Sequence, residues 1–141
     1  MDKYITTGAQ ETQEIAAEFA KKILRKKPGK SAVVLALSGD LGAGKTTFLQ
    51  GFARGLGISE VVNSPTFVIL KRFKNFYHID CYRLDEPKDI LQLGFEEILK
   101  NPHNIIAIEW PEKIAGLLPK EIISIQFTHL EENKRELTVS S

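Results

Sequence analysis

Apolar residues follow two alternating rhythms along the chain, continuous runs of strand length and repeats at helical spacing. Residues 31–37 form a continuous apolar run, which is typical of a strand covered on both faces, and residues 104–110 are expected to form another buried strand. Strands that alternate with helices favour an α/β fold with a largely parallel sheet, and we expect antiparallel strands at its ends. The other expected elements are an edge strand at 3–6, strands at 66–73 and 76–84 joined by a basic turn at 74–75, helices at about 87–99 and 111–118, and a terminal hairpin of 121–127 and 135–140.

The first helix is expected between Thr7 and Pro28. Thr7 and Gln10 match a capping box at its start, and Pro28 with Gly29 ends it. Apolar residues at four-residue spacing predict one buried stripe along this helix. The stripe residues are Ile15, Phe19 and Ile23, with Ala16, Ala20 and Leu24 beside them.

Composition narrows the class of protein. The chain has 141 residues, of which 43% are hydrophobic and 26% charged, as in one soluble globular domain spanning 1–141. The net charge of +1 gives no long-range field that would favour nucleic acid or membrane as the main partner. Cys81 is the only cysteine, so no internal disulfide can form. The polar N-terminus and the lack of any apolar run of about 18 residues indicate a cytoplasmic protein.

The segment GDLGAGKT at residues 39–46 fits the phosphate-binding loop G-x-x-x-x-G-K-[ST]. Its glycines allow backbone N–H groups to point at phosphate oxygens, and the helix that follows adds its positive end. Lys45 supplies a point charge to the β- and γ-phosphates, and the Thr46 hydroxyl is a ligand for Mg²⁺. The loop predicts nucleotide binding and a P-loop NTPase-like three-layer sandwich. The residues assigned to the nucleotide are Gly39, Asp40, Leu41, Gly42, Ala43, Gly44, Lys45, Thr46 and Thr47.

Two carboxylates stand at the ends of expected strands, Asp80 and Glu109. Open α/β sheets bind ligands at the carboxyl ends of their strands, so both acids are candidates for holding a metal ion or orienting the attacking oxygen. The alternative is that each caps a helix or meets a surface lysine. Thr66, in NSPTF, could sense the γ-phosphate as switch loops do, although composition alone favours an ordinary turn there.

Two aromatic residues beside these acids leave their roles open. His78 lies on the same face of its strand as Asp80, where it could orient a group or relay a proton, and a packed core histidine is the alternative. Trp110 follows Glu109 and lies either near the nucleotide or in the core or an interface.

The absence of other motifs restricts the reaction. The chain has no D-x-x-G switch and no N-K-x-D segment in the expected place, so guanine specificity is unsupported. It also has no obvious insertion for the lid of a small-metabolite kinase. These observations favour an ATPase that acts on a partner protein. A stand-alone small-molecule kinase and a non-catalytic nucleotide sensor are the alternatives.

Taken together, the motifs resemble the bacterial TsaE (YjeE-like) family over essentially the whole chain. The resemblance implies a small Mg²⁺-dependent ATPase, required for threonylcarbamoyladenosine (t6A) at position 37 of tRNAs reading ANN codons. It implies a TsaD–TsaB heterodimer as the partner that stimulates a weak ATPase, and indirect contact with tRNA. We expect a monomer in isolation. The motifs that carry the resemblance are GDLGAGKTTF, SPTF, YHIDCYRL, LGFEE and IEWPEK.

The resemblance also implies residue roles. Lys45 and Thr46 would bind the phosphates and Mg²⁺. Thr66 looks like the switch threonine, Asp80 like the acid required for hydrolysis and Glu109 like the metal-associated acid. Trp110 would lie beside the nucleotide.

Overall fold

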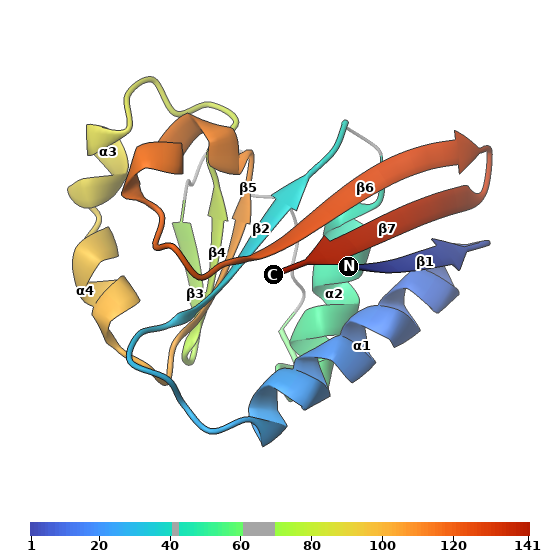
Figure 1. The fold of residues 1–141 in the computed structure, drawn as a ribbon, viewed down its shortest axis with the longest axis horizontal. Helices are drawn as coiled ribbons and strands as arrows, with labels where there is room; N and C mark the ends of the chain where they lie inside the picture. Colours follow the sequence, from blue (N-terminus) through green and yellow to red (C-terminus); the bar gives the residue numbers. More distant parts are fainter. Residues whose placement is uncertain (41–42, 61–69) are drawn as a thin grey trace. The chain divides into compact units, whose positions relative to one another are not determined.

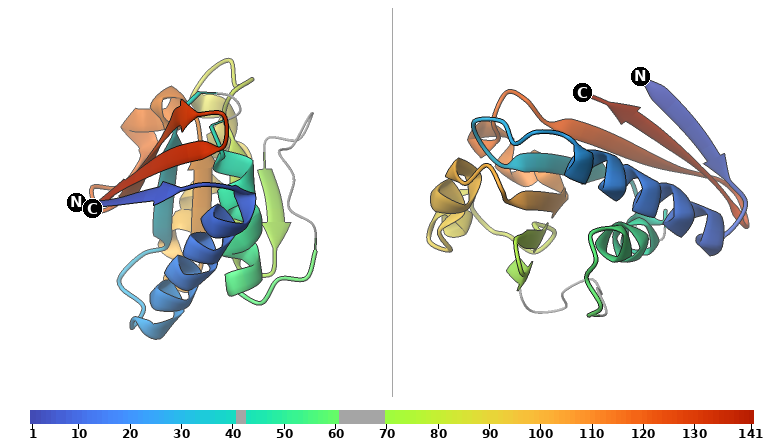
Figure 2. Two further views of the ribbon diagram at one scale, coloured as in Figure 1. Left: turned by 90° about the vertical axis from the view of Figure 1, so that its right-hand side faces the viewer. Right: turned by 90° about the horizontal axis from the view of Figure 1, so that it is seen from below.

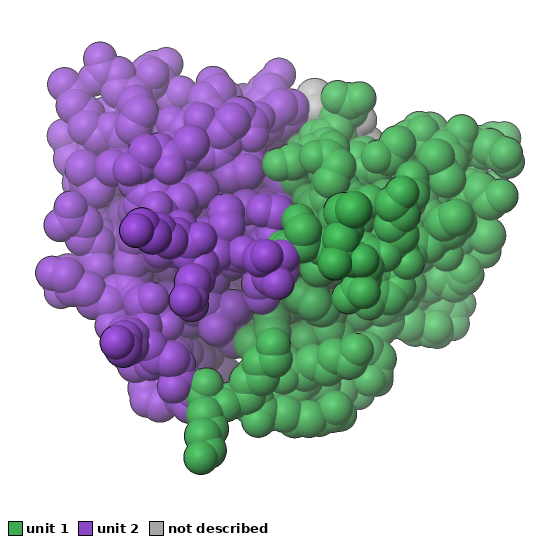
Figure 3. Space-filling model, in the orientation of Figure 1, with its two compact units in different colours: residues 1–27, 38–64, 125–140 green, residues 28–37, 65–124, 141 purple. Residues whose placement is uncertain are grey.

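The computed structural model describes residues 1–40, 43–60 and 70–141 (Figure 1). The chain divides into two compact units, coloured separately in Figure 3. The first unit comprises residues 1–27, 38–64 and 125–140, and the second comprises residues 28–37, 65–124 and 141. The predicted α/β class is confirmed, and the single domain stays a prediction. Within the described ranges, no helix has both the length and the apolar character needed to cross a membrane.

The second unit contains strands in the order β2, β5, β4 and β3 (Figure 1). Their bounds are Val33–Ser38 for β2, Ile105–Glu109 for β5, Phe76–Asp80 for β4 and Leu70–Phe73 for β3. β5 runs parallel to both β2 and β4, whereas β3 runs antiparallel to β4. The parallel centre with an antiparallel end strand is therefore as predicted. The predicted strand at 66–73 is confirmed for 70–73, and its earlier residues lie outside the described ranges.

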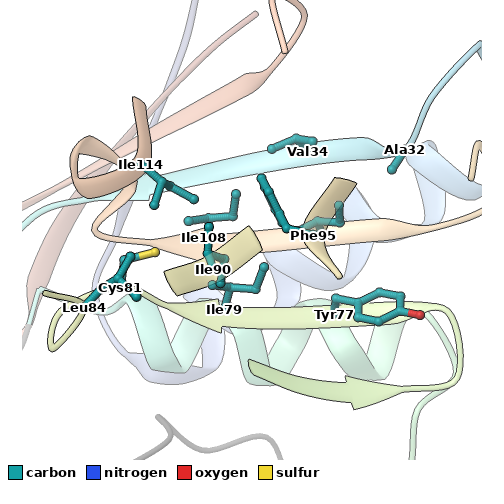
Figure 4. Packing of buried hydrophobic residues seen from close by; sticks show 11 residues of the cluster. Ala32, Val34, Tyr77, Ile79, Cys81, Leu84, Ile90, Phe95, Ile108 and Ile114 are labelled. Atoms are coloured by element: carbon teal, nitrogen blue, oxygen red, sulfur yellow. The ribbon is translucent and has the colours of Figure 1, made fainter. Parts of the chain in front are cut away.

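One face of these strands carries the hydrophobic core of the second unit. Tyr77 and Ile79 of β4 and Ile106 and Ile108 of β5 belong to it, because alternate residues of a strand share a face. Ile90 lies against Ile79 and Ile108 in Figure 4. The core also takes residues from three short helices, which are α3 (Lys88–Leu91), α4 (Phe95–Lys100) and the 3₁₀ helix η1 (Pro111–Leu117). The residues that alternate with these core residues along each strand therefore project from the opposite face.

The helix predicted for residues 87–99 is broken into α3 and α4. Gly94 adopts φ +85°, a left-handed conformation that cannot continue a right-handed helix. Pro87 directly precedes α3, as expected of a helix start. The predicted helix at 111–118 is present as η1.

The first unit contains strands in the order β1 (Asp2–Thr6), β7 (Lys134–Ser140) and β6 (Ile123–Glu131, of which Ile125 onward belongs here). β1 pairs antiparallel with β7, with Tyr4 opposite Leu137. The predicted edge strand and terminal hairpin are both confirmed. Helices α1 (Ala9–Arg25) and α2 (Lys45–Gly55) lie side by side in this unit (Figures 1 and 2).

Small residues line the contact between α1 and α2. A Cβ on Gly51 would lie 2.5 Å from the Cα of Gln13, and a Cβ on Gly55 would lie 2.7 Å from the Cα of Ala17. Phe19 of the predicted stripe packs its ring against Phe48 and Phe52 of α2, with ring centroids 6.4 Å apart. The predicted stripe is nevertheless wrong in part. Leu24 is 54% exposed. The buried residues of α1 are Thr12, Ala16, Ala20 and Ile23.

The capping box predicted for the start of α1 is also wrong, because Thr7 does not pair with Gln10. Thr7 donates from its backbone N and its Oγ1 to Oε1 of Glu11, at 3.2 and 3.0 Å. Gln10 instead donates from Nε2 to Glu14. Gly8 is the residue that precedes α1, so the helix starts one residue later than a cap at Thr7 requires. The side chain that accepts from Thr7 is therefore that of Glu11, one residue after Gln10.

Candidate active site

The predicted phosphate loop joins the end of β2 to the start of α2. Gly39 has φ +145° and Gly44 has φ +108°, conformations that residues with a Cβ rarely adopt. A Cβ on Gly39 would also lie 2.6 Å from the carbonyl oxygen of Phe127 in β6. Only glycine meets both conditions at position 39. Leu41 and Gly42, which were also predicted to bind the nucleotide, lie outside the described residues.

Lys45 is the first residue of α2 and is only 4% exposed. Its Nζ donates to the backbone oxygen of Gly39 at 2.7 Å, so the side chain folds back over the loop that precedes it. A buried ammonium group needs oxygen partners to offset its lost hydration. The loop therefore holds a fixed positive charge at the place where the motif requires one.

The start of α2 is suited to an anion. Gly44 precedes the helix without a side-chain cap, and the first turn carries no acidic residue. The first-turn N–H groups and the helix dipole therefore meet no carboxylate of the same turn. Thr46 and Thr47 lie in this turn and are half-buried. Phosphate groups bind at helix starts of this kind.

The two predicted carboxylates lie in register at the carboxyl ends of neighbouring strands. Glu109 of β5 is opposite Leu37 of β2 on one side and Asp80 of β4 on the other. Residues in register in a parallel sheet share a face, so both acids project from the face opposite the hydrophobic core. Gly39 follows Leu37 by two residues, so the chain enters the phosphate loop directly after this register position.

His78 contacts Glu109 directly. Nε2 of His78 lies 2.7 Å from Oε2 of Glu109, and the two residues are 0% and 3% exposed. A carboxylate only accepts hydrogen bonds, so Nε2 carries the donated proton. Nδ1 of His78 is the one buried side-chain nitrogen or oxygen, among the described residues, that has no hydrogen-bond partner. The sequence placed His78 near Asp80, whereas its contact with Glu109 depends on strand register.

Asp80 is fixed by the chain that follows it. Its Oδ1 accepts a hydrogen bond from the backbone N of Tyr82 at 3.0 Å, an Asx-type turn that sets the carboxylate's direction. Cys81 is fully buried. Burial, followed by the charges of Asp80 and Glu112 and partly offset by Lys113, raises the pKa of the Cys81 thiol to about 12. The thiol is therefore neutral and unreactive at physiological pH.

The ring of Trp110 lies against the ring of Tyr82, a residue that was not among those predicted for the site. The rings of Trp110 and Tyr82 are 5.1 Å apart, and Lys113 donates from Nζ to the backbone oxygen of Tyr82 at 3.2 Å. Trp110 has φ +58° and also packs against the hydrophobic core of the second unit. The available signal was positional, since Trp110 comes one residue after Glu109 and Tyr82 two residues after Asp80, at adjacent strand ends.

These residues fit a nucleotide with Mg²⁺. The glycine conformations, buried Lys45 and the acid-free start of α2 suit a polyphosphate. The described ranges gather no three His, Cys, Asp or Glu side chains around a metal. Mg²⁺ at a nucleotide needs only one or two protein oxygens besides the phosphates. The hydroxyl of Thr46 is an oxygen of that type in the first unit, and the carboxylate of Glu109 is one in the second unit. Thr66, the predicted switch threonine, lies outside the described residues.

Comparison with known proteins gives one consistent family. A family model described as "Threonylcarbamoyl adenosine biosynthesis protein TsaE" matches residues 6–137. A Bacillus subtilis protein named "tRNA threonylcarbamoyladenosine biosynthesis protein TsaE" is 40% identical, over 99% of this chain and 85% of its own. A Rickettsia felis protein of the same name is 40% identical, over 93% of this chain and 75% of its own. The crystal structure of Bacillus subtilis YdiB has a TM-score of 0.76 and 34% identity, over 98% of this chain and 83% of that one.

Proposed function

Because this chain belongs to the TsaE family, we propose that it is a Mg²⁺-dependent ATPase that serves the formation of t6A at position 37 of tRNAs reading ANN codons. The observation that carries the ATPase part is the buried Lys45, whose Nζ is held over the phosphate loop at the start of α2. The names of the relatives support the part that concerns tRNA. We place this activity in the cytoplasm.

The loop and the start of α2 bind the polyphosphate. Backbone N–H groups at the start of α2 and the ammonium of Lys45 supply the partners of the phosphate oxygens. Thr46 and Glu109 are the residues that hold Mg²⁺. When bound, Mg²⁺ neutralises charge on the phosphates during transfer. Glu109 ends β5 at its carboxyl end, where open α/β sheets bind ligands, which supports its assignment.

Asp80 orients the attacking water. Its carboxylate is fixed by the backbone N of Tyr82 and stands at a strand end in register with Glu109. A water that donates to this carboxylate is held with a lone pair free for attack on the γ-phosphate. Thr66 is the residue that senses the γ-phosphate, and Trp110 lies beside the nucleotide.

The hydrolysis is gated by a partner. The TsaD–TsaB heterodimer is the partner that the family resemblance implies, and contact with tRNA is indirect. The ATP-bound protein docks on this transferase, and hydrolysis resets the assembly between turnovers. ATP binding and ATP hydrolysis therefore have separate roles, which separate substitutions can distinguish.

The fluorescence of Trp110, the only tryptophan, provides the test. We predict that Lys45→Ala abolishes the ATP-dependent change in fluorescence, because the loop loses its fixed cation, whereas Asp80→Ala retains it and loses phosphate release. Lys30→Ala, at an exposed lysine, is the control and binds ATP as the wild type does. ATP binding by Lys45→Ala at wild-type affinity would contradict the assignment. Acceptor-dependent loss of ATP without free phosphate would identify a small-molecule kinase instead.

A further inference from the structure

We propose that His78 is a positioning residue that holds the carboxylate of Glu109 in the orientation in which it binds Mg²⁺. The inference rests on the proposed function, since it assigns Glu109 to the metal. The observation behind it is the hydrogen bond of 2.7 Å between Nε2 of His78 and Oε2 of Glu109. Both residues are buried.

The strand register explains how His78 reaches Glu109. His78 is directly opposite Ala107 of β5, and Ala107 is opposite Leu35 of β2. The methyl group of Ala107 leaves space above β5 for an imidazole ring. The ring can therefore extend two positions along β5, to the carboxylate at the end of that strand. Asp80 occupies the place opposite Glu109 itself, so His78 reaches Glu109 on the diagonal.

The hydrogen bond restricts a side chain that would otherwise have several rotamers. Glu109 carries its carboxylate on three rotatable bonds, and a metal that binds a mobile carboxylate must first immobilise it. The donated proton of His78 fixes one oxygen, Oε2, and so fixes the direction of the other. Groups that orient a metal-binding carboxylate in this way commonly strengthen metal binding.

Packing alone gives no reason for a histidine at this position. The side chain is completely buried, and its Nδ1 has no hydrogen-bond partner among the described residues. A leucine would fill a similar volume without burying a ring nitrogen. The polar contact that compensates for burial of this ring is the one with Glu109, which points to a role that acts through the carboxylate.

Two matched amides test the proposal. In His78→Gln the side-chain amide N can reach the position of Nε2, whereas in His78→Asn it is too short. His78→Leu removes the donor and keeps the volume. ATP binding is followed by Trp110 fluorescence, with Mg²⁺ titrated at fixed ATP and with excess EDTA as the metal-free reference. Circular dichroism checks that each variant is folded.

We expect His78→Asn and His78→Leu to raise the Mg²⁺ concentration at half-saturation by about 10- to 100-fold, the usual loss when the hydrogen-bond partner of a metal ligand is removed. His78→Gln stays within about 3-fold of the wild type, and ATP binding in EDTA is unchanged in all three, because the contact acts through the metal ligand.

A wild-type Mg²⁺ midpoint in His78→Asn or His78→Leu overturns the proposal, and so does a loss in His78→Gln as large as that in His78→Asn. A wild-type protein that does not bind ATP refutes the proposed function itself, which is a separate result. If the variants do not fold, ¹⁵N NMR of the wild-type imidazole decides. The Nε2 resonance of His78 shifts when Mg²⁺ is added to the ATP complex, and an unchanged resonance overturns the proposal.

Discussion

Replacement of Gly51 by alanine should destabilise the protein, although the same change at most exposed helical positions is stabilising. Alanine gains about 1 kcal/mol over glycine in a helix interior because it loses less backbone entropy on folding. Gly51 lies in α2 against the backbone of α1. A Cβ there would lie 2.5 Å from the Cα of Gln13, and its nearest neighbour would be the Gln13 carbonyl oxygen.

The magnitude follows from the overlap. Ordinary carbon contacts are about 3.5 Å or more, so α1 must move away from α2 by about 1 Å along the line of contact. The neighbouring atoms of Gln13 are backbone atoms, which cannot change rotamer to make room. Overpacking of this kind costs about 1–3 kcal/mol, and a backbone contact belongs at the upper end of that range. After the gain in helix propensity is subtracted, we expect a net loss of about 1–2 kcal/mol.

Urea denaturation followed by circular dichroism measures this difference. The midpoint of Gly51→Ala should fall with an unchanged slope, since the exposed surface on unfolding is the same. Gly116→Ala is the control, because a Cβ at Gly116 meets nothing within 4 Å. Its stability should stay within about 0.5 kcal/mol of the wild type. A Gly51→Ala protein as stable as the wild type, or more stable, would refute the close contact of α1 and α2.

Two further predictions concern the phosphate loop and the buried thiol. Gly39→Ala combines a positive φ with a Cβ 2.6 Å from the Phe127 oxygen, so it should cost about 2–4 kcal/mol in urea unfolding and weaken ATP binding. Gly57→Ala, with a positive φ in open space, should cost only about 1–2 kcal/mol, and equal losses in the two would contradict this reading. The Cys81 thiol, whose pKa is raised from 9.0 to about 12, stays protonated in the folded protein while the unfolded chain loses its proton. The free energy of unfolding should therefore fall as pH rises above about 9, by at most about 1.4 kcal/mol per pH unit. Thermal unfolding measured from pH 8 to 10.5 tests this, because Cys81→Ala should lack the loss of stability that the thiol causes.

Local patterns in the sequence predicted the strands, the phosphate loop and the two strand-end acids. The apolar runs around Leu35 and Ile106 favour buried strands, because they are of strand length and bounded by polar or glycine residues, and both residues are fully buried. The loop glycines and Lys45 could be assigned from spacing alone, and the positive φ of Gly39 and Gly44 is compatible with that assignment.

The features that could not be predicted depend on contacts between distant segments. The close approach of α1 to α2 depends on Gly51 and Gly55 of α2, which lie against the backbone of Gln13 and Ala17 in a distant segment. The break at Gly94 depends on its positive φ, and since glycine adopts positive and negative φ about equally readily, the sequence alone does not specify which it takes. The bond between His78 and Glu109 depends on the register of β4 and β5, which no pattern within either strand specifies.

Phosphate release from ATP tests the central claim most directly. It should be measured for the wild type, Lys45→Ala and Asp80→Ala, each alone and with purified TsaD–TsaB. We predict slow release by the wild type that rises when the partners are added, and none above background in either variant. Release that is unaffected by TsaD–TsaB, or that persists in Asp80→Ala, would contradict a partner-gated ATPase.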